Sequence, residues 1–321
     1  MANNMGWFYL AHFGNNMWAE PLVDKLGIRG KDVSSFWSPY ANGSLQLIFQ
    51  EDYWKELTAQ LQQAGCTTLV LDMGEGVIFD SHPELAVEGS WTKQRFADEL
   101  ARLRGMGFEV LPKLNFSAGH DLWLGEYARM LSTSTYYRVT KELIAETTEL
   151  FDNPRLFHLG MDEETPGHQQ HYNYIVVRQG EQWWYDFNKL VAATEAAGSR
   201  PWIWSDYAWH HEELFFQNMS KEVVQSNWYY GDFRQEGMDL VYTSLYQKLE
   251  DGGFDQIPTG STWEKTDNLT NTVKFCGERI APERLLGYMQ TPWHPTVRER
   301  KKAHDGAIAE MVNAMQAYKG L

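Results

Sequence analysis

The sequence predicts a (β/α)8 TIM barrel, an α/β fold, that forms a single domain over residues 1–321. Eight short apolar segments have the composition of buried strands, and they alternate with segments of helical spacing at a mean interval of about 40 residues. This alternation implies right-handed crossovers and a parallel sheet. Eight units favour a closed barrel over an open doubly wound sheet, because the segment after the first strand, HFGNNMW, lacks a glycine-rich phosphate-binding fingerprint.

The first half of the chain holds four of the strand candidates. Residues 6–12 (GWFYLAH) form the first, and the glycine-containing segment from about 13 to 50 is predicted to be a long irregular loop. Residues 52–64 have helical spacing, and Gly65 ends that helix. The remaining predicted elements of this half are a strand at 67–73, a helix at 92–105, a strand at 108–115, a helix at 137–151 and a strand at 156–159.

The second half repeats the alternation. The apolar run at 156–159 is continuous, which is typical of a parallel strand covered on both faces. The predicted elements that follow are a helix at 182–197, strands at 200–206 and 222–228, a helix at 240–249, a weak strand at 254–260, a helix at 266–279, a strand at 284–291 and a helix at 296–318.

Composition narrows the classes of partner. A formal net charge of −15 argues against nucleic acid and anionic membranes, which bind basic faces. The chain has no run of about 18 apolar residues, so no membrane span is predicted. Its two cysteines, Cys66 and Cys276, are predicted to be buried thiols. The amino terminus has no basic segment or cleavage site, which predicts a cytoplasmic protein, provided that no signal has been removed.

Polar and aromatic residues follow the predicted strands. Active sites of such barrels form at the carboxyl ends of the strands. The strand at 156–159 is followed by Gly160 and then by the successive acids Asp162, Glu163 and Glu164. Indole faces pack on sugar rings while carboxylates and amides bind hydroxyls, so these positions predict a carbohydrate ligand. The other strand-end candidates are His12, Asp72, Asn115, His120, Trp204, Asp206, Asn227, Trp228, Trp263, Gln290 and Trp293.

The adjacent acids suit glycosyl transfer, which needs a proton donor and stabilisation of an oxocarbenium-like centre. A carboxyl beside a carboxylate and near indoles has a raised pKa, and Glu163 next to Asp162 fits that description. The alternative is that one of the two acids pairs with Arg155 or caps the next helix. His168 and His171 have the spacing of metal ligands, but they lie in a polar segment, and we predict neither metal nor cofactor.

Several motifs resemble those of family 20 glycoside hydrolases, the β-N-acetylhexosaminidases. LFHLGMDEE is similar to that family's H-x-G-G-D-E signature, and PKLNFSAGH to its P-E-x-D-x-P-G-H. WIWSD resembles W-x-[DE] after the fifth strand, while NWYYG and LLGYMQTPW place tryptophans after the sixth and eighth. The resemblance covers the chain from about residue 50 onward and implies a hydrolase with the same barrel.

The resemblance also implies residue roles. Asp162 would orient the 2-acetamido group of the substrate, whose amide oxygen attacks the anomeric carbon, since family 20 is an exception to the two-carboxylate rule. Glu163 would act as general acid and then as base, and His120 would hold Glu163. The residues expected to contact the sugar are Asp72, Trp204, Asp206, Asn227, Trp228, Trp263 and Trp293, with either Tyr229 or Tyr230 at the acetamido oxygen.

Departures from the family pattern leave the substrate open. No arginine precedes Arg29, although the family's first strand carries one. The other changes are Met161 for glycine, Asn115 for aspartate, Ala118 for proline, and His294 with Pro295 where a glutamate is expected after Trp293. One alternative is therefore a glycosidase for sugars without an acetamido group, with Asp206, Asp72 or Asp80 as nucleophile. Another is a non-catalytic sugar-binding barrel.

Overall fold

The computed structural model describes residues 5–15, 43–169 and 175–320. Eight strands form one parallel sheet in the order β8-β7-β6-β5-β2-β1-β10-β9. Parallel bridges from Gln225 to Gln256 and from Trp228 to Thr259 join its two edges, so the fold is the predicted (β/α)8 barrel. The strands are β1 (Gly6–His12), β2 (Thr68–Asp72), β5 (Glu109–Lys113), β6 (Leu156–His158), β7 (Arg200–Trp204), β8 (Val224–Ser226), β9 (Thr259–Ser261) and β10 (Gly287–Thr291).

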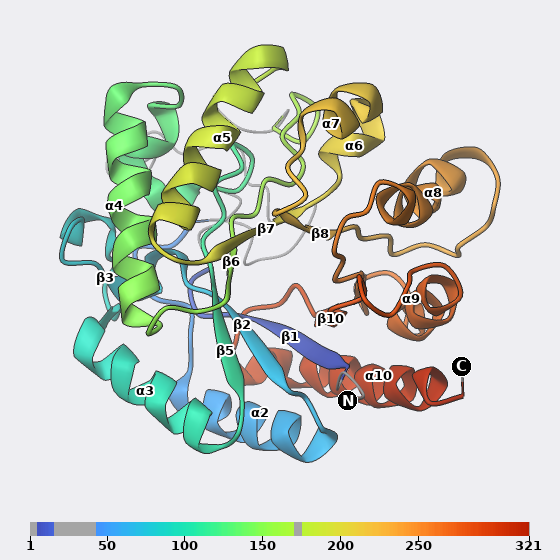
Figure 1. Ribbon diagram of the computed structural model, residues 1–321. Coiled ribbons are helices and arrows are strands. Elements are labelled where there is room, and N and C mark those ends of the chain that lie inside the picture. Colours follow the sequence, from blue (N-terminus) through green and yellow to red (C-terminus); the bar gives the residue numbers. More distant parts are fainter. Residues whose placement is uncertain (1–4, 16–42, 170–174, 321) are drawn as a thin grey trace.

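The helices surround the strands, as Figure 1 shows. Thr92 and Thr133 cap α3 (Lys93–Gly105) and α4 (Ser134–Leu150) by accepting backbone N–H groups, and Gly65 ends α2 (Glu51–Ala64) with φ 88°. A two-stranded pair, β3 (Val77–Ile78) and β4 (Trp91–Thr92), lies outside the barrel sheet. The helices are α2 (Glu51–Ala64), α3 (Lys93–Gly105), α4 (Ser134–Leu150), α5 (Gly180–Ala196), α6 (Tyr207–His210), α7 (Glu212–Asn218), α8 (Gly237–Asp251), α9 (Asn268–Gly277) and α10 (Lys301–Tyr318).

The structure corrects several predicted boundaries. The weak strand at 254–260 is instead β9 at Thr259–Ser261, because Pro258 has no N–H for the ladder and the preceding segment pairs only through isolated bridges. The last helix begins at Lys301 and not at 296, after a short 3-10 turn. Two short helices, α6 and α7, fill the connection after β7, for which no helix range was predicted. Most of the predicted first loop lies outside the described residues.

Successive side chains of each strand point to opposite faces of the sheet, so the apolar core has two layers. Side chains that point into the barrel form one apolar cluster with Phe8, Val70, Leu111 and Trp202, and those that point outward pack against the helices. Toward the carboxyl ends of the strands the inward positions become polar. We call this end of the barrel the carboxyl face.

Other sequence expectations have simple outcomes. Cys66 and Cys276 are free and buried, as predicted. Among the helices of the described residues, none has the length and apolar character needed to span a bilayer.

Candidate active site

The turn after β6 aims two carboxylates at the carboxyl face. Its backbone is left-handed at Gly160 (φ 75°), Met161 (φ 78°) and Glu163 (φ 53°). A side chain at Gly160 would place its Cβ 1.9 Å from Asn115 Oδ1, so only glycine fits. Left-handed conformations at non-glycine residues cost on the order of 1–3 kcal/mol each and cluster at functional sites. The turn is therefore held in this shape by its surroundings.

Asp162 is fixed from two sides. Asn115 Nδ2 donates a hydrogen bond of 2.8 Å to Asp162 Oδ1, and the Ser117 hydroxyl donates to the Asp162 carbonyl oxygen. Asp162 Oδ2 lies 3.4 Å from His120 Nε2. The side chain is nearly buried, so its carboxylate has a single defined orientation.

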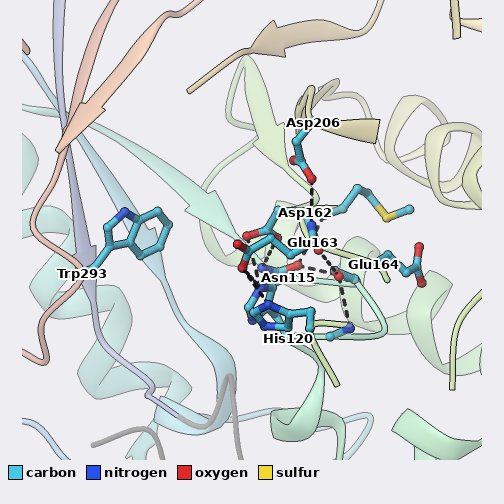
Figure 2. A network of polar contacts seen from close by, with 12 residues as sticks. Asn115, His120, Asp162, Glu163, Glu164, Asp206 and Trp293 are labelled. Atoms are coloured by element: carbon cyan, nitrogen blue, oxygen red, sulfur yellow. Dashed lines mark hydrogen bonds and ion pairs between the residues drawn. The ribbon is translucent and has the colours of Figure 1, made fainter. Parts of the chain in front are cut away.

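Glu163 lies between two imidazoles. Its Oε2 atom is 3.1 Å from His120 Nε2 and 3.3 Å from His168 Nδ1, and its backbone N–H donates a 2.8 Å bond to Asp206 Oδ2. Figure 2 shows His120 at the two carboxylates, Asp206 on the other side of the Glu163 backbone, and Trp293 across from the carboxylates. Glu163 retains 38% exposure of its side chain, whereas His120 retains 2%. Arg155 pairs with Glu109, which removes the alternative that it neutralises one of the acids.

The pKa shifts differ from the sequence expectation. Burial opposes a charged His120 ring, but the Asp162 and Glu163 carboxylates raise the pKa of His120 to about 9. Burial alone would raise the pKa of Glu163, yet the hydrogen bond from His120 and the nearby imidazoles lower it below its ordinary value. The predicted rise at Glu163 is wrong for this reason. The carboxyl with a raised pKa, about 8, is that of Asp206, because it is buried and faces the charge of Asp162.

Aromatic residues line the same face. Trp204 is buried, with its ring 4.5 Å from the ring of His158 and 5.8 Å from that of Trp293. Trp228 Nε1 donates a 3.3 Å bond to Asp206 Oδ1. Trp293 Nε1 donates a 2.9 Å bond to the hydroxyl of Tyr230. These contacts bring four of the predicted aromatic residues together with the acids.

Two other predicted residues, Asp72 and Asn227, form hydrogen bonds to neighbouring residues of the same chain. Asp72 accepts a 2.5 Å bond from buried Lys113, and although burial opposes its charge, Lys113 and His12 lower the pKa of Asp72 to about 2. The amide of Asn227 accepts from Trp209 Nε1 and donates to the Tyr242 carbonyl oxygen.

The other tyrosine is held by other side chains, and Trp263 meets the residue that follows Trp293. Tyr229 stacks on Tyr242 and bonds to Asp239, away from the acids. Trp263 contacts the ring of His294 at 5.4 Å. Of the two tyrosine candidates, Tyr230 is thus the one beside Trp293.

Sequence reasoning missed a buried ion pair behind the turn. Arg178 lies 2.8 Å from Glu164 Oε1 and also donates to the Phe116 carbonyl oxygen, and Glu164 accepts the N–H of Ala118. This pair ties the segments after β5 and β6 to each other. No sequence motif marks Arg178 as the partner of Glu164.

The structure also assembles a group of possible metal ligands. His120, Glu163 and His168 each offer one donor atom, and the three atoms lie within 4.8 Å of one another. His171, the second histidine of the predicted spacing, lies outside the described residues.

Comparisons with known proteins give matches only in structure. No protein-family model matches the sequence, and no curated protein is similar to it in sequence. A chitobiase from Flavobacterium johnsoniae matches 86% of this chain at 16% identity and a TM-score of 0.60, and the match covers 48% of the chitobiase chain. The chain has the fold of family 20 glycoside hydrolases.

Two further structures support the same fold assignment. A family 20 exo-β-N-acetylglucosaminidase from Vibrio harveyi, solved in complex with N-acetylglucosamine, matches 98% of this chain at 12% identity and a TM-score of 0.60, over 56% of its own length. Dispersin B matches 99% of this chain at 11% identity and a TM-score of 0.60, over 100% of its own length. This chain therefore spans about half the length of the first two enzymes and the whole of the third.

Proposed function

We propose that this chain is a glycoside hydrolase that cleaves β-linked N-acetylhexosaminides with retention, by a substrate-assisted mechanism. The observation that carries the proposal is the pair Asp162 and Glu163, which leave β6 side by side and are held by different partners at the carboxyl face. The resemblance of LFHLGMDEE to the family 20 signature and the fold shared with N-acetylglucosaminidases support this assignment.

Asp162 is placed to act on the acetamido group. Its Oδ1 atom is occupied by Asn115, so Oδ2 is the oxygen left to accept the N–H of a substrate amide. A hydrogen bond at that N–H pushes electron density toward the amide oxygen, which then attacks the anomeric carbon and gives an oxazoline-like intermediate. The hydroxyl of Tyr230 is our candidate donor to the amide oxygen, because Trp293 fixes it at the same face.

Glu163 and His120 hold the proton that the leaving group requires. With the pKa of His120 raised and that of Glu163 lowered, the proton resides on His120 in the free protein near neutral pH. A bound sugar would displace water from the partly exposed Glu163 carboxylate, and this desolvation raises its pKa. Glu163 would then take the proton from His120 Nε2, 3.1 Å away, donate it to the glycosidic oxygen and later accept one from the water that opens the intermediate.

The alternative mechanism needs a separate carboxylate nucleophile, and none of its three candidates is well suited to that role. Burial and the nearby charge of Asp162 raise the pKa of Asp206 to about 8, and its carboxyl already accepts bonds from Glu163 N–H and Trp228, so it is a poor anionic nucleophile. Asp72 is bonded to Lys113. Asp80 is largely exposed and pairs with Lys93. The substrate's own amide is therefore the better-supported nucleophile.

Aryl glycosides of several sugars test the proposal. The chain should release the aryl group from β-N-acetylglucosaminide or β-N-acetylgalactosaminide but not from the matching 2-hydroxy sugars, and a thiazoline mimic of the intermediate should inhibit it. Glu163→Gln and Asp162→Asn should each remove nearly all activity, while the exposed Asp80→Asn serves as a control.

Two outcomes would replace the proposal. Turnover of 2-hydroxy sugars that survives Asp162→Asn would favour a separate enzyme nucleophile. Calorimetric binding of sugars without turnover of any glycoside would favour a binding barrel.

A further inference from the structure

His168 has no part in the family resemblance, yet the structure places it against the proposed acid. Its Nδ1 atom lies 3.3 Å from Glu163 Oε2, and its ring meets that of His120 edge-on at 4.7 Å between centroids. A Cβ on Gly119 would lie 3.2 Å from His168 Cδ2, so the glycine leaves room for this approach. The neighbouring Gln169 side chain bonds to the backbone of Ala118 and Val176, which anchors His168 in place.

The three donor atoms have separations that suit a tetrahedral ion. With bonds of about 2.0–2.1 Å, the ligand atoms of a tetrahedral zinc site lie about 3.3–3.4 Å apart. Glu163 Oε2 is 3.1 Å from His120 Nε2 and 3.3 Å from His168 Nδ1. All three atoms lie within 4.8 Å of one another, so small side-chain rotations close the set. Asp162 Oδ2, 3.4 Å from His120 Nε2, or a water can fill the fourth position.

We propose that His120, Glu163 and His168 bind one Zn²⁺ ion, which displaces the proton of His120 to solvent, and that the ion inhibits the chain reversibly by occupying the Glu163 carboxylate. Two imidazoles and one carboxylate favour zinc over Mg²⁺ or Ca²⁺, which prefer all-oxygen sites with more ligands. The 38% exposure of Glu163 gives the ion a route from solvent. The inhibition rests on the proposed function, but the binding of the metal does not.

Equilibrium dialysis of the folded chain against Zn²⁺ tests the binding without any need for turnover. We expect one Zn²⁺ per chain, displaced by a chelator and not by excess Mg²⁺. His168→Gln and Glu163→Gln should each weaken binding by more than the roughly 10–100-fold that loss of an outer-shell partner costs. His210→Gln, at an exposed histidine, is the matched control and should bind like the wild type. Co²⁺ offers a second readout, because its visible absorption reports four-coordinate nitrogen and oxygen ligands.

The outcomes separate the metal site from the enzyme assignment. Absence of bound Zn²⁺, equal binding by the His168→Gln and His210→Gln variants, or effective competition by Mg²⁺ would overturn the site. If glycosides are hydrolysed, Zn²⁺ should slow the wild type and His210→Gln until a chelator is added, and slow His168→Gln far less. Stoichiometric binding with unchanged hydrolysis would overturn the inhibition. Stoichiometric binding in a chain that hydrolyses no glycoside would support the site while the proposed function fails.

Discussion

Gly160→Ala isolates the contact that holds Asp162. The new Cβ would fall 1.9 Å from Asn115 Oδ1, so the Asn115 amide must move. Asn115 bonds to Asp162 Oδ1, Ser117 N and Met161 N, and each such bond contributes about 1 kcal/mol to stability. A left-handed alanine adds roughly 1–2 kcal/mol of strain. The variant should lose about 3–5 kcal/mol of unfolding free energy and, because Asp162 is released, about 10²-fold in activity.

Gly253→Ala is the matched control, because Gly253 has the same φ of 75° and a Cβ added there would meet no heavy atom within 4 Å. It should show only the strain of roughly 1–2 kcal/mol, with activity unchanged. Denaturant unfolding and the kinetics of an aryl N-acetylhexosaminide measure both effects. Equal losses of stability and activity in the two variants would refute the role of Asn115 in holding Asp162.

Three further predictions concern charge. The pKa of His120 is raised to about 9 in the folded state by the Asp162 and Glu163 carboxylates. This pairing therefore stabilises the fold fully below about pH 6.5, and the contribution is lost as the pH rises through about 9. His120→Asn should remove that step from the unfolding free energy. The pKa of Asp206 is raised to about 8, so burying its ionised form costs stability as pH rises from about 4 to 8, and Asp206→Asn should be more stable than the wild type at pH 8. Lys113→Met removes the nearest cation from the buried Asp72 carboxylate and leaves it with His12, and unfolding should show a loss of about 3–5 kcal/mol.

Each charge prediction has an outcome that contradicts it. An unchanged stability step near pH 9 in His120→Asn would mean that His120 is not the titrating group. A stability of Asp206→Asn below that of the wild type at pH 8 would mean that Asp206 contributes as an anion. For Lys113→Met, the double variant with Asp72→Asn should recover stability, and no recovery would show that the ion pair is not the cause.

The local pattern of apolar residues was sufficient to predict most strands of the barrel. The first strand was predicted at 6–12 and lies at Gly6–His12, because an apolar run between polar segments leaves little choice of register. The same rule failed at β9, where proline displaced the regular ladder. It gave no range for α6 and α7, which are too short for helical periodicity to be visible.

The site was predictable where it depended on strand ends. Asp162, Glu163 and His120 meet because parallel strands deliver their carboxyl ends to one face. His168 and Arg178 could not be placed, since both belong to the long connection after β6, whose path depends on bonds to the segment after β5. The pKa of Glu163 was predicted in the wrong direction because burial and the neighbouring acid were weighed without the lowering effect of the expected His120 hydrogen bond, and because the His168 imidazole was not placed at the carboxylate.

The replacement of the family's aspartate by Asn115 has an electrostatic reason in this structure. Asp162, Glu163 and Asp206 already lie close together, and among the described residues His120 is the charged imidazole that bonds to this group. A carboxylate at position 115 would place a further negative oxygen about where Asn115 Nδ2 lies, 2.8 Å from Asp162 Oδ1. Two unit charges at that separation repel by about 6 kcal/mol at an effective dielectric constant of 20. A neutral amide avoids this repulsion and donates to Asp162, so the change at position 115 keeps Asp162 oriented and does not by itself argue against catalysis.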